Sequence, residues 1–130
     1  MKKHLVLSFK SEFERIVVGE TKYLLRFFKK RRDFLKELQS GDLVFLKVGK
    51  EILGQFIIGK VIVVENFQEE DLDWIRKIIG EGDVLEKVNS GNFLHKNSIA
   101  LIVKIEKIEQ LITSPIEIPI VRKDWVILED

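Results

Sequence analysis

The 130-residue sequence contains no cysteine, two prolines, one methionine and one tyrosine. Without cysteine the chain has no disulfide, no thiolate metal site and no cysteine nucleophile. It also lacks any apolar run near the roughly 20 residues that span a bilayer. The basic start is followed by a short apolar run that Ser8 and Lys10 interrupt too early for a signal peptide. We therefore expect a cytoplasmic protein that makes no membrane contact.

The composition is that of a folded domain. Hydrophobic residues make up 45% of the chain and charged residues 33%, which excludes disorder and supplies both a core and a polar surface. One core usually occupies about 100–200 residues, so residues 1–130 are expected to form a single domain. The many lysines, glutamates and isoleucines also suit a thermophilic source.

The net charge of +1 hides a strong separation of charge along the sequence. Five acids and no base lie between Glu65 and Asp73. Between Lys22 and Lys36, Asp33 is the one acid among seven bases. The chain is therefore expected to carry one basic and one acidic surface. The seven bases are Lys22, Arg26, Lys29, Lys30, Arg31, Arg32 and Lys36.

Short apolar runs separated by turn residues predict about six strands with inserted helices. Ser11 and Glu14 have the spacing of a capping box, and Gly19 is placed to end that first helix. Gly54 and Gly59 predict bulges or a bend inside one long strand. The predicted fold class is α+β, a small mixed and partly closed β-barrel with two or three short helices. Strands are expected at residues 5–9, 23–28, 43–48, 52–64, 99–105 and 125–128, extended segments at 108–112 and 116–121, and helical turns at 11–18, 33–38, 68–79 and 83–88.

Three segments together resemble the ASCH-type domains of the PUA-like superfamily. The first segment is Leu7-Ser8-Phe9-Lys10 with Phe13, Ile16, Gly19, Lys22 and Arg26. The second is Ser40-Gly41-Asp42-Leu43-Val44 with Gly59-Lys60-Val61. The third is Ile105-Glu106-Lys107-Ile108 with Pro115-Ile116-Glu117-Ile118. The resemblance covers roughly three quarters of the chain, and an archaeal-style member of the superfamily is the most similar. It implies a PUA-like barrel associated with nucleic acids.

One element departs from the family pattern. Thr21 stands where the family has lysine, Lys22 comes one place late, and Leu24 replaces a polar residue. Some ASCH proteins are amidohydrolases that act on acetylated cytidine through a lysine, a threonine and a glutamate. The apolar residue at position 24 favours binding over that hydrolysis.

The basic segment is the main functional signal. Its cations are interleaved with aromatic residues, as in proteins that neutralise phosphates and stack on bases. Lys22 and Arg26 share a strand face and are expected to line a cleft with Lys10, beside the first helix. The alternative for Arg26 is a salt bridge to Glu12, Glu20 or another acid. The candidate nucleic-acid-binding residues are Lys10, Lys22, Arg26, Lys29, Lys30, Arg31 and Arg32.

The two histidines, His4 and His95, show no metal-binding spacing. The sequence therefore predicts no metal site, no cofactor and no catalytic residue. The leading hypothesis is a non-catalytic module that binds RNA, another single-stranded nucleic acid or a modified nucleobase. The alternatives are a small nucleoside amidohydrolase and a protein–protein adaptor that uses opposed charged faces. The sequence gives no indication of the oligomeric state.

Overall fold

Six strands and three helices make up the part of the chain that the structure describes. The computed structural model describes residues 1–80, 99–119 and 123–128. Its strands are β1 (Lys3–Leu7), β2 (Tyr23–Phe28), β3 (Leu43–Val48), β4 (Glu51–Val64), β5 (Ile99–Gln110) and β6 (Trp125–Leu128). Its helices are α1 (Lys10–Val17), the 3-10 helix η1 (Asp33–Glu37) and α2 (Asp71–Ile79). None of these described helices has the length and apolar character needed to cross a membrane.

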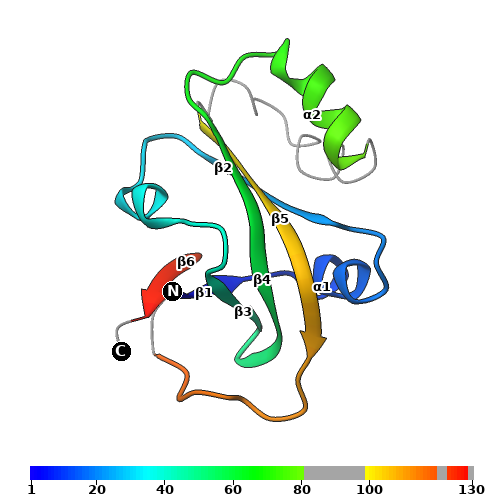
Figure 1. The fold of residues 1–130 in the computed structure, drawn as a ribbon, viewed down its shortest axis with the longest axis vertical. Coiled ribbons are helices and arrows are strands. Elements are labelled where there is room, and N and C mark those ends of the chain that lie inside the picture. Colours follow the sequence, from blue (N-terminus) through cyan, green and yellow to red (C-terminus); the bar gives the residue numbers. More distant parts are fainter. Residues whose placement is uncertain (81–98, 120–122, 129–130) are drawn as a thin grey trace.

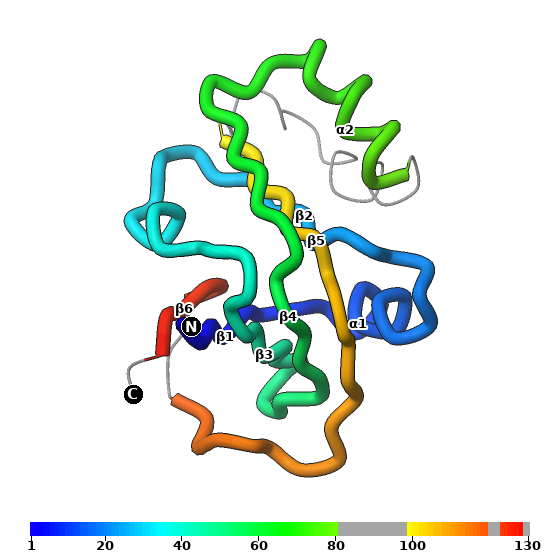
Figure 2. The backbone as a smooth tube through the Cα atoms, viewed as in Figure 1, coloured from blue at the N-terminus to red at the C-terminus, as the bar shows by residue number. Residues whose placement is uncertain are grey.

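All six strands belong to one mixed sheet in the order β2-β5-β4-β3-β1-β6. β1 runs parallel to β3, and every other neighbouring pair is antiparallel. The long strands β4 and β5 run side by side along much of the molecule, with α2 near one end and the β3–β4 hairpin near the other (Figure 1). The sheet curls into a partly open barrel (Figure 2), which confirms the predicted α+β class and mixed barrel.

Irregular pairing bends β4 where the sequence places glycine. The register between β3 and β4 shifts beside Gly54, and the register between β4 and β5 shifts at Gly59. Phe13 of α1 packs directly over Gly54, where an added Cβ would lie 2.6 Å from Cε1 of the ring. The predicted bends at both glycines are confirmed, and Gly54 also allows α1 to dock closely on the sheet.

The strand β2 and residues 99–103 of the adjacent strand β5 are largely buried on both faces. Alternate residues of each strand enter different hydrophobic clusters, as the alternation in residues 99–105 predicts. One face packs against α1 and η1, and the other packs against α2. The first cluster includes Leu24, Phe28, Leu101, Val103, Phe13, Ile16 and Phe34, and the second includes Leu25, Ala100, Ile102, Leu72, Ile75 and Ile79.

The first helix begins earlier than predicted. α1 starts at Lys10 with Phe9 as its N-cap, and no side chain caps it. The predicted capping box at Ser11 and Glu14 is therefore wrong. Ser8 and Glu12 form the hydrogen bond at this end instead, with Ser8 Oγ donating to Glu12 Oε1 at 2.6 Å. Glu12 also binds a distant arginine, so a tertiary contact overrides the local signal.

The other predicted elements are largely confirmed. Strands β2, β3 and β6 have the predicted bounds, and η1 confirms the helical turn at 33–38. β1 lies two residues earlier than predicted, and α2 begins only at Asp71, whose carboxylate accepts a hydrogen bond from Gln68 N at 2.9 Å. β5 continues past residue 105 to Gln110 through a position with φ +51° at Lys107. The extended segment at 116–121 is not a strand in its described part, and the helix predicted at 83–88 lies outside the described residues.

Replacing Gly54 with alanine is expected to lower the free energy of unfolding by about 1–3 kcal/mol. The new methyl group would press on the Phe13 ring at 2.6 Å and lie 3.1 Å from the Glu109 carbonyl oxygen. The matched control is Gly59→Ala, where the three atoms nearest to the new methyl group all belong to the Glu106 side chain, which is 46% exposed and can turn away at the expense of a weak surface ion pair with Lys104. That control should stay within about 0.5 kcal/mol of the wild type. Urea unfolding measures both values, and equal losses would contradict this account of α1 docking.

Candidate nucleic-acid interface

A buried ion pair lies at the start of α1. Arg26 of β2 holds the Glu12 carboxylate with two nitrogens, Nη2 to Oε1 at 2.7 Å and Nη1 to Oε2 at 2.8 Å. The two side chains are 13% and 5% exposed. Arg26 also donates to the carbonyl oxygens of Leu25 (2.8 Å) and Leu7 (3.0 Å). The guanidinium is therefore committed to internal partners, as the salt-bridge alternative for Arg26 predicted.

The three residues expected to line one cleft do not converge on a single point. Lys10 begins α1, at the end of the helix where Arg26 binds Glu12. Lys22 lies near the other end of α1, because its neighbour Thr21 donates its backbone N–H to the Arg15 carbonyl oxygen. An eight-residue helix is about 12 Å long. Lys10 and Arg26 thus share one end of α1, and Lys22 stands at the other end.

Leu24 lies between these two ends, on the same strand face as Lys22 and Arg26. Its side chain is 1% exposed and belongs to the hydrophobic cluster beneath α1. The position where the family pattern has a polar residue is therefore part of the core. It offers no hydrogen-bonding group to a ligand.

The basic loop from Lys29 to Arg32 follows β2. Lys29, Lys30 and Arg31 are exposed, and Arg31 forms an ion pair with Glu65 at the beginning of the acidic segment. Arg32 pairs with Asp124 at 3.2 Å. Part of the basic charge is therefore neutralised by acids that are distant in sequence, and the predicted separation into basic and acidic surfaces is incomplete.

Arg32 is also held by aromatic rings. Its guanidinium carbon lies 5.3 Å from the ring centre of Phe28 and 5.4 Å from that of Phe34. Phe34 in turn stacks on Trp125 with ring centres 5.0 Å apart. These contacts join the end of β2, η1 and the start of β6, and they fix the base of the loop.

A second buried network was not predicted from the sequence. His4 is 0% exposed, and its Nε2 lies 2.9 Å from Asp42 Oδ2. Trp125 Nε1–H donates to His4 Nδ1 at 3.3 Å, so the ring proton lies on Nε2 and points at Asp42. Asp42 also accepts the backbone N–H groups of Lys2 and Gln39. This network ties β1 to β6 and to the turn before β3, which gives His4 a structural role.

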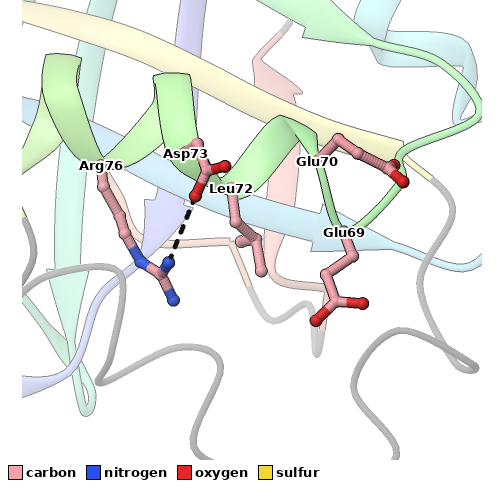
Figure 3. A pocket seen from close by; sticks show the side chains of 5 residues that line it. All are labelled: Glu69, Glu70, Leu72, Asp73 and Arg76. Carbon is pink, nitrogen blue, oxygen red and sulfur yellow. Dashed lines mark ion pairs between the residues drawn. The ribbon is translucent and has the colours of Figure 1, made fainter.

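A hollow of about 300 Å³ lies on α2, far from the basic loop in the sequence. Figure 3 shows its lining of three acids, one leucine and Arg76, with Arg76 turned towards Asp73. The two charged groups are 3.7 Å apart. Because acids dominate its rim, the hollow repels phosphates and does not belong to the candidate interface. Its lining residues are Glu69, Glu70, Leu72, Asp73 and Arg76.

Comparison of the structure with solved proteins identifies the architecture. Crystal structures of two point mutants of the ASCH protein ZmASCH from Zymomonas mobilis superpose with TM-scores of 0.57. The chain has the fold of an ASCH-type, PUA-like domain. The matches cover 85% and 84% of this chain and 73% and 70% of those chains, at 8% sequence identity. No family model and no curated protein sequence matches the chain. The ASCH resemblance is thus confirmed by the fold.

Truncating Arg26 to alanine is expected to lower the free energy of unfolding by about 3–5 kcal/mol, because Glu12 is left buried without its arginine. Lys22→Ala removes an exposed cation from the same strand face and should change stability by about 0.5 kcal/mol or less. Urea unfolding measures the free energy of unfolding of both variants.

The double variant Glu12→Leu/Arg26→Met should recover much of the stability lost in Arg26→Ala, since no buried charge remains. A single Arg26→Ala variant as stable as Lys22→Ala would contradict the structural role of the arginine.

Acid is expected to weaken the His4–Asp42 network. Burial raises the pKa of the Asp42 carboxyl, but hydrogen bonds from His4 and from the Lys2 and Gln39 backbones outweigh it, so the pKa lies below its ordinary 3.8. A lowered folded-state pKa means that ionised Asp42 contributes stability above about pH 4, which is lost as the pH falls through the folded-state pKa.

The measurement is urea unfolding of the wild type and of Asp42→Ala across this range. The variant should be less stable by about 1.5–3 kcal/mol near neutral pH. The difference should narrow as the pH falls below about 4. A difference that stays constant over this range would show that the charge of Asp42 does not stabilise the fold.

Proposed function

We propose that this chain is a non-catalytic module that binds single-stranded RNA or a modified nucleobase through its basic loop. The observation that carries the proposal is the geometry of residues 29–32. The exposed side chains of Lys29 and Lys30 stand beside Arg32, which is fixed over two aromatic rings. A rigid base that presents exposed cations suits the phosphate backbone of a flexible strand.

Under this proposal some of the candidate residues contact the nucleic acid directly, and the others hold the surrounding structure in place. Lys10, Lys22, Lys29 and Lys30 are exposed and are proposed to contact phosphates. Arg26 is proposed to act indirectly, by holding Glu12 and the end of β1 in place. Arg31 and Arg32 are proposed to shape the loop through Glu65 and Asp124, and to add positive potential around it.

The two alternatives have less support. A nucleoside amidohydrolase needs polar groups that converge on the bound nucleoside, and Leu24 contributes core packing where the resemblance implies a polar group. An adaptor with opposed charged faces needs those faces to stay separate, and the Arg31–Glu65 ion pair joins them within one molecule. Binding is therefore the function that the geometry favours.

Replacing Lys29 and Lys30 together with alanine is expected to weaken binding of a fluorescein-labelled single-stranded RNA. The slope of log affinity against log salt should also flatten by about 1.4, because each phosphate contact on a single strand contributes about 0.7. Fluorescence anisotropy over a salt series measures both.

The control is Lys50→Ala/Lys77→Ala, which removes the same charge from exposed positions elsewhere on the molecule. It should leave the slope unchanged. If both double variants flatten the slope equally, the attraction is a diffuse effect of net charge, and the loop is not a binding site.

A further inference from the structure

Two exposed apolar side chains stand together where β1 ends. Leu7 is 41% exposed and Phe9 is 70% exposed. Phe9 has φ −78° and ψ 152°, so the chain is still extended there. Residues two apart in an extended chain point to the same side. Ser8 between them is only 3% exposed, which agrees with this alternation, so the aromatic ring and the leucine form one small apolar patch on the surface.

Lysines from three separate segments have their backbones close to this patch. Lys47 of β3 is paired with Leu7 in the parallel register of the sheet. Leu7 N donates to the Asp124 carbonyl oxygen, which places Lys123 close by, and Lys10 directly follows Phe9. None of these three lysines forms an ion pair with any residue in the described ranges 1–80, 99–119 and 123–128.

Two acids close to the patch are already neutralised. The carboxylate of Glu12 is held by Arg26, and that of Asp124 is held by Arg32. The three lysines therefore leave an excess of positive charge around the apolar patch. Such charge favours an anionic partner that also presents a flat apolar face.

The backbone on both sides of the Phe9 ring is held by hydrogen bonds. The Leu7 carbonyl oxygen accepts from Arg26 at 3.0 Å, and Ser8 N donates to the Lys47 carbonyl oxygen at 2.8 Å. The Phe9 carbonyl oxygen accepts from Phe13 N at 2.9 Å. The ring is thus presented from a fixed backbone, which reduces the ordering cost of binding.

We propose that Phe9 is a stacking platform for one unpaired base of a single-stranded nucleic acid, with Lys10, Lys47 and Lys123 on the adjoining phosphates. The inference rests on the proposed function and names a contact that the basic loop does not supply. An aromatic ring accepts the face of any base, and the lysines supply the charge that the phosphates need. A patch of two side chains is far below the roughly 800 Å² that each partner buries in a stable protein interface.

The test compares wild type and Phe9→Leu with two labelled probes, a single-stranded RNA of ten adenosines and an abasic strand of the same length. Phe9→Leu keeps an apolar side chain and removes the aromatic face. It should bind the adenosine strand about tenfold more weakly, with an unchanged salt slope. The two proteins should bind the abasic strand equally.

Two further variants complete the design. Val18→Ala trims another exposed apolar side chain, 69% exposed and beyond the far end of α1, and should bind both probes like the wild type. Phe9→Trp keeps a stacking face and should retain the binding that Phe9→Leu loses.

The outcomes separate this inference from the proposed function. If the wild type binds the adenosine strand and Phe9→Leu binds it equally well, the stacking platform is overturned and the basic loop is not. An equal loss on the abasic strand also overturns stacking, because the ring then acts without a base. If the wild type binds neither probe at any salt concentration, both proposals fail.

Discussion

The ion pair between Glu12 and Arg26 joins three elements that the hydrogen bonds of the sheet leave separate. Among the described strands β2 pairs only with β5, and β1 pairs with β3 and β6. Arg26 crosses from β2 to the first turn of α1 and to the last carbonyl of β1. A buried pair of this kind contributes little net stability, since desolvation offsets much of the attraction. Its effect here is positional, because it specifies where α1 begins and how the end of β1 is presented.

Side chains also complete the barrel where strand pairing stops. The sheet ends at β2 on one side and at β6 on the other. Phe34 of η1 contacts Phe28 at the end of β2 and stacks on Trp125 at the start of β6. Trp125 then donates to His4, which is bound to Asp42. The opening of the barrel is thus bridged by aromatic packing and a buried polar network, and its polar groups are satisfied at close range.

The sequence predicts the strands more accurately than the site. The strands depend on residues that are close together in the sequence, whereas the site depends on residues that are far apart in it. The bounds of β2 and β3 follow from apolar runs that turn residues interrupt, which is local information. The start of α1 depends on Arg26, fourteen residues from Glu12, and the local Ser11 signal is overridden. Strand parity predicts that Lys22 and Arg26 share one face. It could not show that the two residues serve opposite ends of α1.

The charge pattern is also set by contacts between residues that are distant in the sequence. These contacts change where a binding surface should be sought. The run from Arg26 to Arg32 looks like the strongest site in the sequence, yet three of its arginines are paired with Glu12, Glu65 and Asp124. Lys47 and Lys123 are separated by 76 positions in the sequence (123 − 47), but both lie beside Leu7 in the fold. A contiguous run of cations tends to recruit acids, since like charges that are crowded together repel one another. Cations that the sheet gathers from separate segments form no ion pair within the described residues, and here their backbones lie close to the exposed ring of Phe9.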